Sequence, residues 1–173
     1  MRHHAYQPSS KFVIEPINFD KYTDRDMLRY CLGATLYMPG TKDFLEPILT
    51  KKYPGLTSMV MCFEDACKEE LVPEAEQNVI RLLDALNVEL EKGTIKYEEI
   101  PLIIFRVRNV EQFKHFSSML KPEHIHLVTA FNFPKFNMEV GEAYYEHLEY
   151  LNQKFGEVIY GMPILESKEM AYL

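Results

Sequence analysis

Charged or flexible residues follow the short apolar runs of this sequence, at the points where strands are expected to end. In chain order they are Gly40, Glu64, Asp65, Arg106, Arg108, Lys135 and Glu166. Carboxylates and water can hold a divalent cation such as Mg²⁺, and arginine side chains bind carboxylates or phosphates through two parallel hydrogen bonds. If the fold brings these residues together, they predict a mixed-charge pocket for a metal ion and an anionic small molecule.

Each residue also has an explanation that involves no chemistry. Glu64 and Asp65 suit the first turn of a following helix, where acids favour the helix dipole. Arg108 is also consistent with a surface charge, Lys135 with a solvated loop and Glu166 with an exposed tail. Loops after strands are polar in any α/β protein because they meet water. The prediction of a shared site therefore depends on the common position of these residues on successive strands.

Five short apolar runs are the predicted strands. They cover residues 34–38, 59–63, 102–107, 125–131 and 158–165. Most are rich in β-branched or aromatic residues, and each is too short for a buried helix. Their continuous apolarity is typical of strands that are covered on both faces.

The stretches between these runs are predicted helices, over residues 74–91, 110–120 and 139–155. The first is the clearest because its apolar residues fall on one face, with Pro73 in the first turn and Gly93 just past the end. Strands that alternate with helices indicate a parallel sheet with right-handed crossovers.

An open doubly wound sheet and a closed barrel both satisfy this alternation. The first run is followed by Pro39-Gly40-Thr41 rather than by a G-x-G-x-x-G segment, so a dinucleotide-binding fold is unsupported. In a parallel barrel, the carboxyl ends of the strands share the face that carries the active site. That arrangement would gather the polar residues around one cavity.

The length and composition are typical of a globular protein with one domain. The 173 residues divide into an irregular arm over 1–20 and a domain over 21–173. The net charge is −7 and no dense Lys/Arg cluster exists, which argues against nucleic acid as a partner. The sequence shows no signal peptide and no apolar run long enough to cross a membrane. Of the three cysteines, Cys62 and Cys67 lack the second pair of ligands that a metal site needs, so buried thiols are the favoured interpretation. We therefore expect a cytoplasmic protein with no membrane partner.

Five segments resemble those of citrate lyase beta subunits, in the same order. They are LYMPGT at 36–41, MCFEDACKEE at 61–70, PLIIFRVRN at 101–109, FPKF at 133–136 and MPILES at 162–167. Over residues 25–170 the chain is thus similar to the HpcH/HpaI aldolase and citrate lyase beta-subunit superfamily, and most similar to its bacterial carbon–carbon bond lyases of the TIM-barrel fold.

The resemblance implies an α/β fold, an incomplete (β/α)₈ TIM barrel with about the first five parallel strands, because a complete barrel needs ~250 residues. It also implies a Mg²⁺-dependent lyase or aldolase that acts on an acyl-CoA thioester or a related hydroxy or oxo acid through an enolate. The implied catalytic residues are Arg106, Glu64, Asp65 and Lys135, the substrate-binding residues Gly40, Arg106 and Arg108, and the metal ligand Glu166. Which of the two arginines faces the pocket is left open by the segment R-V-R-N.

An unclosed barrel would leave two strand edges open to another chain. We therefore expect a homo-oligomer or a complementing chain, in addition to a small carboxylate or acyl-CoA substrate. The alternative is a catalytically incomplete remnant that binds a partner through its exposed strand edges. A small α/β enzyme of another kind is disfavoured because no nucleophile constellation or phosphate loop is present.

Overall fold

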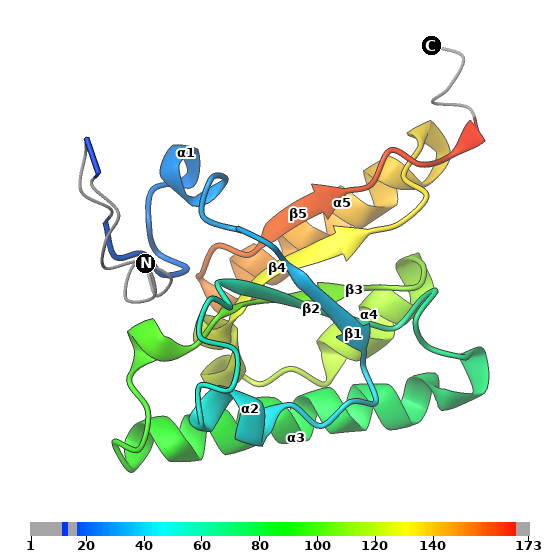
Figure 1. The fold of residues 1–173 in the computed structure, drawn as a ribbon. Coiled ribbons are helices and arrows are strands. Elements are labelled where there is room, and N and C mark those ends of the chain that lie inside the picture. The colour runs from blue at the N-terminus through cyan, green and yellow to red at the C-terminus, as the bar shows by residue number, and fades with distance from the viewer. Residues whose placement is uncertain (1–11, 14–16, 169–173) are drawn as a thin grey trace.

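The structure, a computed structural model that describes residues 12–13 and 17–168, is built around one parallel sheet (Figure 1). Its strands are β1 (Leu36–Pro39), β2 (Ser58–Cys62), β3 (Leu102–Arg106), β4 (Val128–Phe133) and β5 (Tyr160–Pro163). They lie side by side in chain order, and every neighbouring pair is parallel. A doubly wound sheet would reverse its strand order at a switch point. The prediction of an α/β fold with five parallel strands in barrel order is therefore confirmed.

The helices of the described residues are α1 (Arg25–Leu28), α2 (Leu45–Leu49), α3 (Val72–Glu91), α4 (Val110–Ser118) and α5 (Met138–Phe155), with short 3₁₀ turns η2 (Glu69–Leu71), η3 (Tyr97–Glu99) and η4 (Pro122–Leu127). The three long predicted helices are confirmed to within a few residues. Asn109 and Asn137 cap α4 and α5 because their side chains accept hydrogen bonds from first-turn N–H groups. The predicted arm lies mostly outside the described residues, and residues 17–20 form neither helix nor strand.

The largest difference from the predicted strands lies before β4. The prediction began this strand at residue 125, whereas residues 122–127 form η4. Pro122 suits the first turn of a helix, and the Nδ1 atom of His124 accepts a hydrogen bond from the Lys121 N–H at 3.3 Å. These local hydrogen bonds override the β propensity of Ile125.

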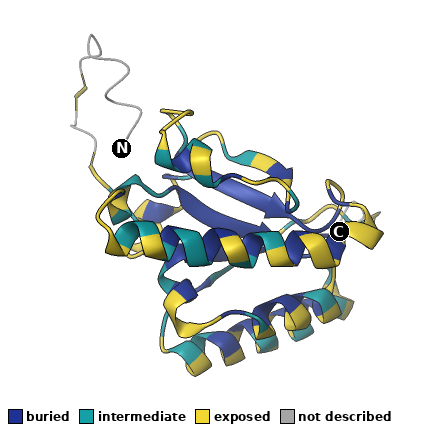
Figure 2. Cartoon of the chain, turned by 90° about the horizontal axis from the view of Figure 1, so that it is seen from below, coloured by how far each residue is buried: buried dark blue, intermediate teal, exposed yellow. Residues whose placement is uncertain are grey.

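One face of the sheet is covered by α3, α4 and α5 (Figures 1 and 2). Side chains of the strands that point to this face include Met61, Phe105 and Phe131, all fully buried. They pack against apolar residues of the helices, such as Leu83 and Phe116. Figure 2 shows the central strands as buried and the helices with exposed residues on their outer sides. The main hydrophobic core therefore lies between the sheet and these helices.

The opposite face of the sheet would be the interior of a barrel, and we call it the inner face. Val60, Ile104 and Ala130 form a buried cluster there. The segment before β1 covers its amino end, where the carbonyl of Leu32 accepts hydrogen bonds from the side chains of Thr57 and Ser58 at 2.6 Å each. The carboxyl end of the inner face is thus left for polar residues.

Gly40 lies in the turn after β1, and its N–H donates to the Cys62 carbonyl at 2.8 Å. A Cβ at this position would lie 2.9 Å from both Ala75 Cβ and Phe63 Cε1. Close packing between strand and helix therefore requires glycine here. The expected approach of this backbone to a ligand stays a prediction.

We predict that Gly40→Ala lowers the free energy of unfolding by about 1–3 kcal/mol, because the added methyl overpacks the core. Gly55→Ala is the matched control, since a Cβ at Gly55 meets no atom within 4 Å. The control should be neutral or stabilising by up to about 1 kcal/mol. Urea unfolding of the three proteins measures both effects, and equal stabilities would contradict the packing explanation.

Candidate active site

Arg106 ends β3 and points to the inner face of the sheet. It is in register with Cys62 on β2 and with Asn132 on β4. Side chains alternate between faces along a strand, and Ile104, two residues earlier on β3, belongs to the buried cluster of the inner face. The guanidinium therefore lies at the carboxyl end of the inner face, just beyond that apolar cluster.

Three carboxylates converge on one nitrogen of this guanidinium. The Nη2 atom of Arg106 lies 2.7 Å from Glu64 Oε2, 3.0 Å from Asp65 Oδ2 and 3.1 Å from Glu166 Oε1. The Arg106 side chain is only 12% exposed, and that of Glu64 is buried as well. The loops after β2 and β5 thus meet at the end of β3, and these residues together with Lys135 are called the Arg106 cluster below.

Lys135 adds a second cation from the loop after β4. Its Nζ atom lies 2.6 Å from Glu64 Oε1, and its backbone N–H donates to Glu166 Oε1 at 3.1 Å. The backbone of Lys135 has a φ of 50°, in the left-handed region that residues with a Cβ adopt only at a cost. This turn aligns the next residue with β5, because the Phe136 N–H donates to the Ile164 carbonyl at 3.1 Å.

The surroundings of Asp65 and Lys135 favour the ionised forms of these two side chains. A hydrogen bond with the Glu64 carboxyl, together with the charges of Arg106 and Lys135, lowers the pKa of Asp65 below its ordinary value. The hydrogen bond and attraction to Glu64 raise the pKa of Lys135. Three carboxylates against two cations leave a formal charge of −1. This surplus of negative charge suits an additional cation.

The carboxylates of the cluster fit a hard cation with few protein ligands. Among the described residues, no group of three His, Cys, Asp or Glu side chains is arranged to hold a metal ion. Magnesium needs only one or two carboxylates, with water completing its coordination. Asp65 and Glu166 are the accessible acids of the cluster, with side chains 64% and 36% exposed. Their oxygens are thus within reach of a hydrated cation.

Arg108 lies outside the cluster. Its guanidinium is 3.4 Å from the carbonyl oxygens of Phe63 and Cys67 and 3.4 Å from Glu69 Oε2, so it braces the loop after β2. Of the two arginines that the sequence left open, Arg106 is therefore the one that faces the other candidate residues. A role for Arg108 in substrate binding stays a prediction.

Asn132 is a polar residue of the inner face that the sequence analysis did not select. It is 3% exposed, and its side-chain Oδ1 atom is buried without a hydrogen-bond partner. The Nε atom of Arg106, on the neighbouring strand, is likewise buried without a partner. A signal existed, because Asn132 directly follows the predicted strand 125–131 and precedes the Phe133-Pro134-Lys135 segment.

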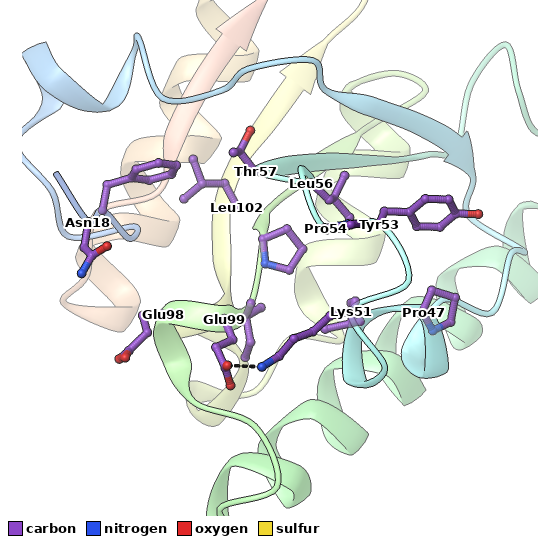
Figure 3. A pocket seen from close by; sticks show the side chains of 14 residues that line it. Asn18, Pro47, Lys51, Tyr53, Pro54, Leu56, Thr57, Glu98, Glu99 and Leu102 are labelled. Carbon is purple, nitrogen blue, oxygen red and sulfur yellow. Dashed lines mark hydrogen bonds and ion pairs between the residues drawn. The ribbon is translucent and has the colours of Figure 1, made fainter. Parts of the chain in front are cut away.

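A cavity of about 350 Å³ lies at the other end of the sheet (Figure 3). It opens near the amino ends of β2 and β3, and its lining includes Tyr53, Thr57 and Leu102. Lys51 and Glu99 form an ion pair at this cavity. It is therefore separate from the Arg106 cluster, which sits at the carboxyl ends of the strands.

Parallel strands in barrel order, with charged side chains gathered at their carboxyl ends, are the arrangement found in TIM-barrel proteins. The sequence model of a family described as C-C bond lyase of the TIM-barrel fold matches residues 26–173. The match covers most of the chain, so this protein belongs to that family of carbon–carbon bond lyases. Searches of curated proteins and of solved structures found no significant match. No helix in the described part of the chain is both long and apolar enough to cross a bilayer.

The left-handed backbone of Lys135 generates a stability prediction. Lys135→Gly and Lys135→Ala both remove the ammonium group, but only glycine adopts a φ of 50° without strain. We expect the glycine variant to be more stable than the alanine variant by about 1–2 kcal/mol. Thermal or urea unfolding measures the difference.

Lys114 supplies the control for this pair, because it is exposed and lies within α4. There the order should reverse, with alanine about 1 kcal/mol more stable than glycine. The same order at both positions would show that Lys135 is not held in the left-handed conformation.

Proposed function

We propose that this chain carries active-site residues of a Mg²⁺-dependent lyase of the HpcH/HpaI aldolase and citrate lyase beta type. The observation that supports this proposal is the convergence of Glu64, Asp65, Glu166 and Lys135 on Arg106 at the carboxyl ends of β2 to β5. A lyase of this type cleaves a carbon–carbon bond next to a carbonyl group. The proposed substrate is an acyl-CoA thioester or a related hydroxy or oxo acid.

The chemistry explains why a buried guanidinium is needed. When the bond between the α and β carbons breaks, its electron pair moves onto the carbonyl oxygen and forms an enolate. The β-hydroxyl would give its proton to a carboxylate of the Arg106 cluster and become a carbonyl group, and the enolate would then be protonated on carbon, so atoms and charge balance. Arg106 would bind the oxygen on which the negative charge develops and stabilise it more in the transition state than in the ground state.

The remaining residues of the cluster have distinct proposed roles. Glu166, with Asp65 beside it, would hold the cation through carboxylate oxygens and water. A bound divalent cation supplies Lewis-acid stabilisation of the developing negative charge. Lys135 and Glu64 form an ion pair at 2.6 Å that would fix the position of Arg106 and add positive charge near an anionic substrate.

All three cysteines are free and buried, in keeping with a proposed location in the reducing cytoplasm.

The open edges of the sheet support a second candidate function. Within the described residues, β1 and β5 each pair with one strand only, so each offers a row of backbone groups to another chain. A second copy of this chain, or a complementing chain, would pair there. If the chain lacks catalysis of its own, this pairing would make it an interaction domain.

Magnesium binding tests the proposed role of Glu166. We expect Glu166→Gln to weaken Mg²⁺ binding about tenfold or more in isothermal titration calorimetry, because a charged oxygen ligand is lost. Glu142→Gln, an exposed acid on α5, is the matched control and should bind Mg²⁺ like the unmodified protein. Equal affinities in all three proteins would contradict the metal site.

Cleavage assays test the proposed role of Arg106. With a panel of 3-hydroxyacyl-CoA thioesters and the free hydroxy acids, Arg106→Lys should lower kcat about 10²-fold or more, because lysine keeps the charge but lacks the planar fork. Arg81→Lys, on the outer side of α3, should leave kcat unchanged. If the unmodified protein cleaves no member of the panel, the proposed substrate class is wrong.

A further inference from the structure

Two buried polar atoms without partners lie on neighbouring strands at the candidate site. They are the Nε atom of Arg106 and the Oδ1 atom of Asn132. A buried polar group without a hydrogen bond is unfavourable, so native proteins contain few of them. The two atoms belong to paired residues of β3 and β4, so one ligand group that bonded to both would remove this cost.

The sheet register places the two side chains together. Arg106 and Asn132 are paired residues of the parallel strands β3 and β4, and paired residues point to the same face. Two residues earlier, the paired Ile104 and Ala130 belong to the buried cluster of the inner face. Both unpartnered atoms thus belong to the inner face. They lie next to its buried apolar cluster, at the carboxyl end of the strands where the Arg106 cluster lies.

The hydrogen bonds that Arg106 already makes leave its Nε atom for a ligand. Its Nη2 atom contacts the carboxylates of Glu64, Asp65 and Glu166. The Nε–H is a donor only, and the amide oxygen of Asn132 is an acceptor only. A group that satisfies both must accept one hydrogen bond and donate another.

We infer that Arg106 Nε and Asn132 Oδ1 together bind a hydroxyl group of the ligand, and that Asn132 makes the site selective for hydroxy acids over their deoxy analogues. A carboxylate or keto oxygen would accept from Arg106 but would set its lone pairs against those of Asn132. A hydroxyl oxygen accepts from Nε and donates its proton to Oδ1. Asn132 is thus a specificity-determining residue. The identity of the ligand as a hydroxy acid rests on the proposed lyase function, whereas the demand for a donor and acceptor does not.

Matched ligand pairs test this inference. Malate against succinate, and 3-hydroxybutyrate against butyrate, differ by one hydroxyl group each. The unmodified protein with Mg²⁺ should bind the hydroxylated member of at least one pair about tenfold or more tightly in calorimetry, since sites built to hydrogen-bond a hydroxyl group reject analogues that lack it. Asn132→Leu should reduce this preference to about twofold or less.

Thr129→Val is the control because it removes another buried oxygen without a partner from the same strand, near the amino end of the sheet. It should leave the preference unchanged. Asn132→Leu should fold with at least the stability of the unmodified protein, since it replaces an unsatisfied polar group by an apolar one of similar size. No preference in either pair, or a preference that survives Asn132→Leu, would overturn the inference.

The same proteins separate this inference from the proposed function. A hydroxyl preference that depends on Asn132, without cleavage of any substrate in the panel, would support the inference and contradict the lyase proposal. Cleavage that depends on Arg106, without a hydroxyl preference, would support the lyase proposal and overturn the inference.

Discussion

The candidate site depends on the contact of one guanidinium with three carboxylates. Glu64 is buried, and the Nη2 atom of Arg106 at 2.7 Å is one of its two cationic partners. Removing one partner of a buried ion pair leaves an uncompensated charge, which costs about 3–5 kcal/mol. Asp65 and Glu166 lie on the same nitrogen and would repel each other without it. Arg106 therefore positions the loops after β2 and β5 relative to β3.

This interaction has its geometry because the sheet is sequential and parallel. Because neighbouring strands follow chain order, the loops after β2, β3, β4 and β5 lie at the same edge of the sheet. Glu64 and Glu166, although distant in sequence, therefore both contact the Arg106 guanidinium. The amino end of the inner face is closed by the segment that contains Leu28 and Leu32. The polar residues of the Arg106 cluster gather at the opposite, carboxyl end of this face.

Much of this arrangement could be predicted from the sequence, because buried parallel strands are continuous apolar runs and their ends are marked by polar residues. The choice between Arg106 and Arg108 could not be predicted. If the strand continued through both residues, their side chains would point to the same face of the sheet. The strand ends at Arg106, and the Asn109 cap of α4 turns the chain so that Arg108 reaches the other side of the β2 loop. Asn132 was missed for a related reason. The predicted strand ended at residue 131, two residues before the end of β4, and so left Asn132 outside the strand.

A purely structural ion-pair network is the main alternative explanation of the Arg106 cluster. Such a network would satisfy its buried donors and acceptors, since partly satisfied ones are less favourable than an apolar core. Here the Nε atom of Arg106 and the Oδ1 atom of Asn132 remain without partners, and the adjoining Lys135 has a left-handed backbone. Unfavourable features of this kind concentrate at functional sites, where a ligand compensates for them. Their position beside Arg106, in a chain of the carbon–carbon bond lyase family, favours a site for chemistry over a structural brace.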